Sequence, residues 1–154
     1  MEKGKKNYIG GNLLFEGEYI NDKRNGKGKE YYNDGNLMFE GEYLNDKKLE
    51  GKGYDLKNNI IYELKKGKGF VKEYYNNGKL RFEGEYVNGQ RNGKGKEYNY
   101  DSKLRFEGEY LNDKKNGKGK EYYAKGNLKF DGEYLYNYNI KGELYIKEKV
   151  EFEG

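Results

Sequence analysis

Leu13-Leu14-Phe15-Glu16-Gly17-Glu18-Tyr19-Ile20 is the stretch that decides the fold, because its pattern returns along the chain. The segment Phe-Glu-Gly-Glu-Tyr recurs at Phe15–Tyr19, Phe39–Tyr43, Phe82–Tyr86 and Phe106–Tyr110, with a near copy at 130–134 and the start of another at 152–154. A second block, Gly-Lys-Gly, follows at Gly26, Gly51, Gly67, Gly93 and Gly117. Two blocks that keep nearly constant phase indicate a repeat protein and not merely a biased composition.

Each unit has the pattern of a β-hairpin. In the strand 13–20, alternation places Phe15, Gly17 and Tyr19 on one face and the glutamates on the other. A polar loop at 21–25 leads to a second strand at 26–32, and Asp34-Gly35 is typical of a tight turn into the next unit. The sequence therefore predicts an all-β fold, an elongated single-layer twisted antiparallel sheet of tandem β-hairpins.

Glycines inside the predicted strands need a reason, because glycine in a strand costs backbone entropy. We expect Gly17, Gly26 and Gly28 to leave space for Phe and Tyr rings of neighbouring strands to lie flat across the backbone. Repeated cross-strand aromatic contacts would then replace a conventional core. On the opposite face, Glu16 and Glu18 are expected to face Lys27 and Lys29.

Composition limits the possible functions. The chain of 154 residues is 38% charged and 17% aromatic, with a net charge of +4. It has no His or Cys and a single serine, Ser102, which excludes nucleophilic triads and His or Cys metal sites by count. Paired carboxylates recur in every unit, unlike a catalytic pair, which is normally singular. We therefore expect no enzyme activity, no metal and no cofactor.

The repeats divide the chain into regular units and one degenerate unit. We interpret 1–154 as one domain, with half units at 1–11 and 148–154. The full units span about 12–35, 36–58, 79–102, 103–126 and 127–147. The degenerate unit, 59–78, lacks the Phe-x-Gly-x-Tyr block and has a shorter loop, which predicts a kink or a change of twist.

The spacing of the two blocks resembles that of the MORN (membrane occupation and recognition nexus) repeat over essentially the whole chain. Phe15-Glu16-Gly17-Glu18-Tyr19 is similar to the family's Tyr-x-Gly-x-Trp segment, and Asn25-Gly26-Lys27-Gly28 is similar to its His-Gly-x-Gly segment. The resemblance implies a single-layer twisted sheet and roles in scaffolding, cytoskeletal or membrane-proximal tethering, and binding of peptides or helices. Tyr replaces the usual Trp at Tyr19 and its equivalents, which counts against anchoring at a lipid interface.

The aromatic stripe is the first candidate site. A single-layer sheet cannot bury both faces, so we expect these rings to stay partly exposed and to hold a peptide or helix of a partner protein along a groove. The predicted groove residues are Phe15, Tyr19, Tyr32, Phe39, Tyr43, Phe82, Tyr86, Phe106, Tyr110, Phe130 and Tyr134.

Basic residues in the hairpin loops give an alternative function, that of a membrane-proximal adaptor which binds anionic lipid. The candidate contacts are Lys23, Arg24, Lys47, Lys48, Arg91, Lys114 and Lys115. Nearby aspartates dilute this charge, and no nucleic-acid partner is expected. A further alternative is a cell-surface carbohydrate-binding repeat, which also uses Gly- and Tyr-rich hairpins.

The sequence also predicts how the ends of the ribbon associate and in which cellular compartment the protein lies. An open sheet has unpaired edge strands, so Tyr8–Ile9 and Val150–Phe152 are candidates for pairing with another copy, in a homodimer or a filament. The absence of cysteine, of an apolar run of about 20 residues and of a signal-peptide pattern favours a cytoplasmic protein, with membrane or cytoskeletal association as the family's alternative.

Overall fold

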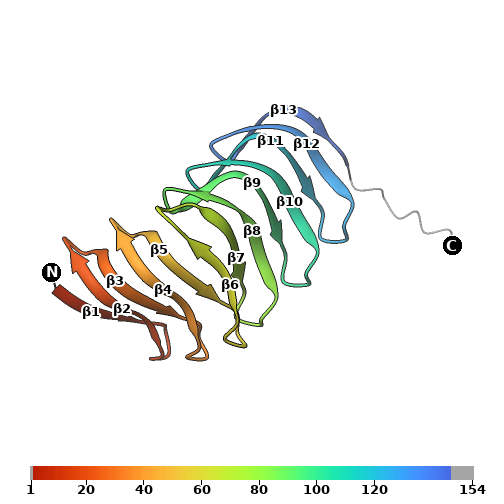
Figure 1. Cartoon of the computed structure of the whole chain (residues 1–154). Helices are drawn as coiled ribbons and strands as arrows, with labels where there is room; N and C mark the ends of the chain where they lie inside the picture. Colours follow the sequence, from red (N-terminus) through yellow and green to blue (C-terminus); the bar gives the residue numbers. More distant parts are fainter. Residues whose placement is uncertain (1, 147–154) are drawn as a thin grey trace.

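The computed structural model describes residues 2–146, which form thirteen β-strands and no helix (Figure 1). Consecutive strands pair antiparallel and form two open sheets, β1 to β6 and β7 to β13. The strands are β1 (Glu2–Asn7), β2 (Leu13–Ile20), β3 (Lys23–Tyr31), β4 (Leu37–Leu44), β5 (Lys47–Tyr54), β6 (Ile60–Leu64), β7 (Gly69–Tyr74), β8 (Leu80–Val87), β9 (Gln90–Tyr98), β10 (Leu104–Leu111), β11 (Lys114–Tyr122), β12 (Leu128–Leu135) and β13 (Tyr138–Leu144). The predicted all-β ribbon of tandem hairpins is confirmed.

The strands are strongly bent, as their curvature in Figure 1 shows. Gly17 on β2 lies opposite Gly28 on β3, but Tyr19 lies opposite Arg24, so β3 carries extra residues at a bulge. Gly26 within this bulge has a φ of 98°, a conformation that favours glycine. The ends of the strand approach each other as a result. Arg24 Nη1 lies 2.6 Å from Glu30 Oε1, although a straight strand would separate these residues by about 20 Å.

Rows of glycine carry the aromatic rings on the concave side of the bend. Gly17, Gly28 and Gly41 lie opposite one another on β2, β3 and β4, and the same register returns in the second sheet. A Cβ on Gly28 would lie 2.6 Å from atoms of the Phe15 ring and 3.0 Å from the Tyr43 ring. The expectation that glycine makes room for rings is therefore confirmed for Gly17 and Gly28. It is not confirmed for Gly26, which lies in the bulge, and a Cβ at its equivalents Gly93 and Gly117 would meet glutamate side chains.

The rings form a column in each sheet. Phe15 contacts Tyr19 and Tyr43 edge-to-face, with centroid separations of 5.4 and 5.3 Å, and the same geometry recurs at Phe106 and Phe130. Such pairs add about 0.5–1.5 kcal/mol each beyond the burial of area. The hydrophobic core therefore consists of side chains on the concave side of the bent sheet itself, and no second layer of strands or helices covers it in residues 2–146.

The degenerate unit forms the junction of the two sheets. Between β6 and β7 the ladder is reduced to an isolated bridge, Lys65 with Lys68. Leu64 and Val71 take the places of the glycine row, opposite Gly51 and Gly84, and both side chains are buried. Tyr86 packs against the cores on both sides, which connects them.

Two equivalences predicted from the sequence are wrong. Gly51 lies opposite Gly41, in the position that Gly28, not Gly26, has opposite Gly17. Gly67 is not an equivalent of Gly26 either, because it lies in the turn between β6 and β7. The residue opposite Tyr86 is Gly69, in the position that Gly26 has opposite Tyr43. The short turn shifts the repeat by two residues, so Phe70 and Val71 take the places of a lysine and a glycine.

Candidate partner-binding surface

The aromatic stripe is not an exposed groove. Nine of its eleven predicted residues are buried, and Tyr19 and Tyr86 are half-buried. The buried residues are Phe15, Tyr32, Phe39, Tyr43, Phe82, Phe106, Tyr110, Phe130 and Tyr134. The expectation of exposure is wrong because it assumed a nearly flat sheet, whereas the bend encloses the rings within each hairpin.

Ion pairs close the concave side over the rings. Arg91 Nη2 lies 2.8 Å from Glu73 Oε2, and its Nη1 lies 3.2 Å from Glu97 Oε1. The guanidinium stands 3.9 Å from the centre of the Phe82 ring, while the hydroxyl of Tyr110 donates a hydrogen bond of 2.6 Å to Glu97. Arg24 and Glu30 repeat this arrangement in the first sheet, with Tyr43 donating to Glu30.

These contacts change the interpretation of the loop cations. Four of the seven predicted anion contacts have side chains that cover phenylalanine rings inside the curve. These four are Arg24, Lys48, Arg91 and Lys115, which also pair with glutamates. These four side chains are half-buried inside the curve and are not exposed loop cations, whereas Lys23, Lys47 and Lys114 are exposed.

Glu30 and Tyr43, which close the first sheet, have shifted pKa values. Burial alone would raise the pKa of Glu30, but Lys48 and Arg24, together with the hydrogen bond from Tyr43, hold this pKa below its usual value. Burial, followed by the charge of Glu30, raises the pKa of Tyr43. At neutral pH the carboxylate of Glu30 is therefore charged and the phenol of Tyr43 is neutral.

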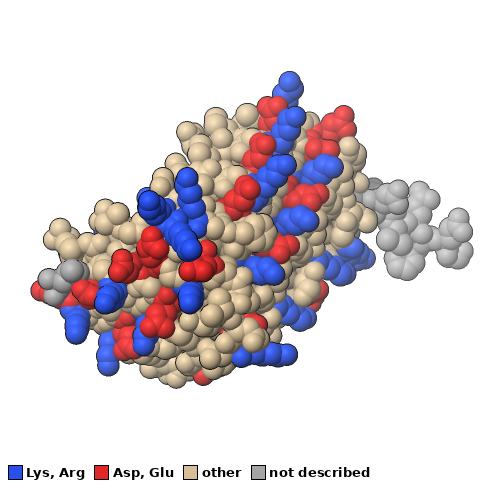
Figure 2. All heavy atoms as spheres, in the orientation of Figure 1, with Lys and Arg blue, Asp and Glu red and all other residues tan. Residues whose placement is uncertain are grey.

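The opposite, convex face carries two rows of charge, called here row A and row B. In row A, Lys5, Glu16, Lys29 and Glu40 lie opposite one another on successive strands, so the sign alternates. Row A continues through Lys52 and Glu63, then through Lys72, Glu83, Lys96, Glu107, Lys120, Asp131 and Glu143. Row B consists of Lys3, Glu18, Lys27, Glu42 and Glu50, then Phe70, Glu85, Lys94, Glu109, Lys118, Glu133 and Lys141. Figure 2 shows these rows as diagonal stripes of acid and base, and the predicted opposition of Glu and Lys is confirmed.

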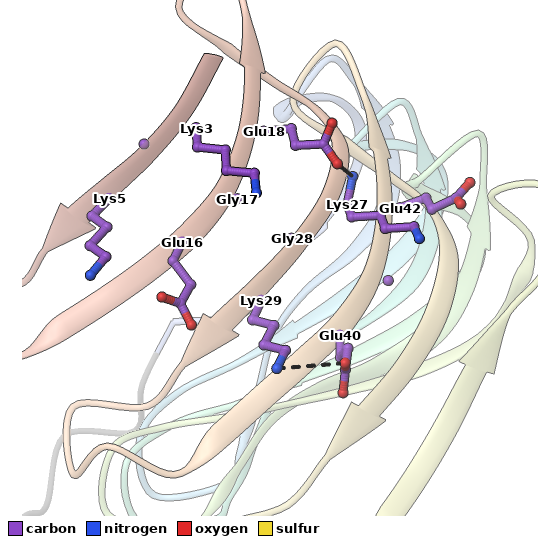
Figure 3. A pocket seen from close by; sticks show the side chains of 12 residues that line it. Lys3, Lys5, Glu16, Gly17, Glu18, Lys27, Gly28, Lys29, Glu40 and Glu42 are labelled. Carbon is purple, nitrogen blue, oxygen red and sulfur yellow. Dashed lines mark hydrogen bonds and ion pairs between the residues drawn. The ribbon is translucent and has the colours of Figure 1, made fainter. Parts of the chain in front are cut away.

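Two hollows lie between the rows. The first, of about 900 Å³, extends over β1 to β4, and its floor is the bare backbone of Gly17, Gly28 and their neighbours. Figure 3 shows the acidic and basic side chains that line it, with Lys29 Nζ 3.8 Å from Glu40 Oε1. The second hollow, of about 690 Å³, extends over β7 to β12. The glycines therefore have two effects, since they admit rings on one face and leave a groove on the other.

Phe70 interrupts row B at the end of the second hollow. It lies opposite Glu85, in the position that Lys118 has opposite Glu133, and it lines the hollow with 55% of its surface exposed. Exposed aromatic residues beside polar rims are typical of binding hot spots. Phe70 is not among the residues predicted from the sequence, because the predicted register of the degenerate unit differs by two residues from the observed one. The signal was present, since Gly69-Phe70-Val71 departs from the Gly-Lys-Gly of Gly93–Gly95.

Tandem bent hairpins, in which aromatic rings pack over rows of glycine, place the chain in the class of β-hairpin repeat modules. The MORN repeat model matches residues 15–37, 82–102 and 106–128, and a MORN repeat variant matches residues 71–88. Together these segments cover just over half of the chain, which belongs to the MORN repeat family. This family is generally a non-catalytic repeat module, known in protein- and membrane-associated roles.

A search of curated proteins gave no match. Residues 2–146 include no helix able to cross a membrane.

Proposed function

We propose that this chain is a non-catalytic scaffold which binds a segment of a partner protein along the convex face, over β7 to β12. The segment lies in the second hollow, with its acidic and basic side chains against rows A and B and an apolar residue against Phe70. The observation that carries the proposal is an exposed aromatic side chain at the end of a charged hollow with a bare backbone floor.

The charged rows are positioned before any partner arrives. Tyr98 and Tyr122 donate hydrogen bonds of 2.9 and 2.7 Å to Glu83 and Glu107 of row A. In row B, Glu85 accepts from the amide of Lys94, at 2.8 Å. Fixed side chains lose less conformational freedom on binding, which favours affinity. Over β8 to β12, like signs recur about 9.5 Å apart along each row, so a partner with both charge signs fits better than a purely anionic one.

The lipid alternative has less support. An anionic membrane surface attracts clusters of one sign, whereas rows A and B alternate in sign over β8 to β12. In addition, four of the seven loop cations cover phenylalanine rings inside the curve. A partner protein therefore remains the better proposal. Its segment is proposed to bind the charged convex face and not the aromatic concave side.

Phe70→Lys tests the binding surface, because lysine stands at the equivalent positions 94 and 118 and should leave the sheet intact. Peptides selected from a random phage library on the wild-type protein are expected to bind Phe70→Lys at least about tenfold more weakly, measured by calorimetry. They are expected to carry both charge signs and an apolar residue.

Leu44→Lys is the matched control. Leu44 is 50% exposed at the end of β4, outside both hollows, so its replacement should leave peptide affinity unchanged. Equal affinity of the selected peptides for the wild type and Phe70→Lys would place binding elsewhere and contradict the proposal.

A further inference from the structure

Among the described residues, β13 is the edge strand of the second sheet, and its residues differ from those at the equivalent positions of β11. All seven of its residues are exposed, among them Ile140 at 56% and Leu144 at 65%. In the preceding hairpin, Lys115 lies opposite Tyr110 and Glu121 lies opposite Phe106, and these two residues close the curve. In β13 the equivalent residues are Asn139 and Leu144, opposite Tyr134 and Phe130. Within residues 2–146, the hairpin of β12 and β13 therefore has no closing ion pair at these two positions, and it presents the apolar side chains of Ile140 and Leu144.

We propose that two copies of the chain join through β13, which pairs antiparallel with β13 of the second copy about a two-fold axis at Gly142. Gly142 continues the glycine row, opposite Gly132, so this register extends the row into the second copy. It also sets Lys141 of each copy opposite Glu143 of the other, and Ile140 opposite Leu144. The edge is complementary to itself, as an isologous contact requires.

The charges within the chain favour this pairing. Glu143 ends row A opposite Asp131, so two acids face each other where the row otherwise alternates. Within the described residues its hydrogen-bond donor is the hydroxyl of Tyr145, at 2.8 Å. Lys141 of the second copy would restore the alternation on the outer side of Glu143. Opposite charges at paired positions stabilise a sheet, and like charges destabilise it.

The topology favours β13 over the other edge. Each strand runs antiparallel to the next, so the odd-numbered strands β1 and β13 run in the same direction. A head-to-tail stack would therefore join β13 to β1 in parallel, against the pattern of the sheet. Pairing of β1 with itself about Gly4 would set Lys3 opposite Lys5, a like-charge contact. Of the pairings expected from the sequence, the segment Val150–Phe152 lies outside the described residues.

Sedimentation equilibrium over a wide range of concentrations tests the proposal. The full-length wild type is expected to associate as a dimer. Glu143→Lys places Lys141 opposite a lysine twice in each dimer, so the dissociation constant should rise about tenfold or more. The same change places lysine opposite Asp131 within the chain, so the folded monomer should not be weakened. Its far-UV circular dichroism should match that of the wild type.

The double variant Lys141→Glu/Glu143→Lys restores opposite charges across the two-fold axis and is expected to recover the dimer. Lys5→Glu on β1 is the control at the other edge and should leave dimerisation unchanged. A wild type that is monomeric at every concentration would overturn the proposal, as would a dimer that Glu143→Lys does not weaken.

Discussion

Replacing Gly108 with valine is expected to lower the free energy of unfolding by about 3 kcal/mol or more. A Cβ at this position would lie 2.5 Å from the carbonyl oxygen of Lys118 and 2.6 Å from the Cα of Gly119. It would also lie 2.9 Å from Cζ of Phe106, so the strand partner and the ring would both have to move. The neighbouring hairpin packs on the same ring, and the loss should spread across the interface between units.

Urea unfolding followed by circular dichroism measures this loss. Lys114→Ala is the control, since the Lys114 side chain is exposed and its removal should change stability by less than about 0.5 kcal/mol. Similar unfolding midpoints for the two variants would show that the glycine row is not a packing surface.

Arg91→Ala is expected to lower the free energy of unfolding by about 3 kcal/mol. The change leaves Glu73 and Glu97 without their guanidinium partner in a site where the Arg91 side chain is only 19% exposed. It also uncovers the Phe82 ring, which lies 3.9 Å from the guanidinium. Removing one partner of a partly buried network costs more than the network contributes as a whole, because the remaining charges lose their compensation.

Arg81→Ala provides a matched control on the same acid. Arg81 pairs with Glu73 at 3.3 Å, but its side chain is 48% exposed, so its removal should cost less than about 1 kcal/mol. Equal losses for Arg81→Ala and Arg91→Ala in urea unfolding would mean that the inner network does not close the core.

The sequence predicted the hairpins and both faces of the strands because these follow from a period of two along the strand. Phe15, Gly17 and Glu16 lie on the faces that alternation assigned to them. The bend at Gly26 could not be predicted, because one glycine does not reveal how many residues a bulge contains. The recurrence of a cation six residues before a glutamate, as at Arg24, Arg91 and Lys115, was the available sign of closing pairs.

The candidate site was harder to predict than the fold. Exposure of the rings was inferred from the thinness of the sheet, and that inference fails when a thin sheet curves around its own side chains. Phe70 is not predicted as a site residue, because the turn at Lys65–Lys68 shifts the register of the repeat by two residues. Only the strand pairing reveals that shift.

Tyrosine nitration in the folded protein, mapped by mass spectrometry, tests most directly whether the rings lie sealed inside the curve. Tyr100 and Tyr136, at 57% and 53% exposure, are expected to react readily. Tyr43 and Tyr110, at 2% and 4%, should be protected, because they are buried and burial raises the pKa of both phenols away from the reactive anion. All four should react in urea. Nitration of Tyr43 and Tyr110 as fast as Tyr100 in the folded state would contradict the account and return the aromatic side to the surface.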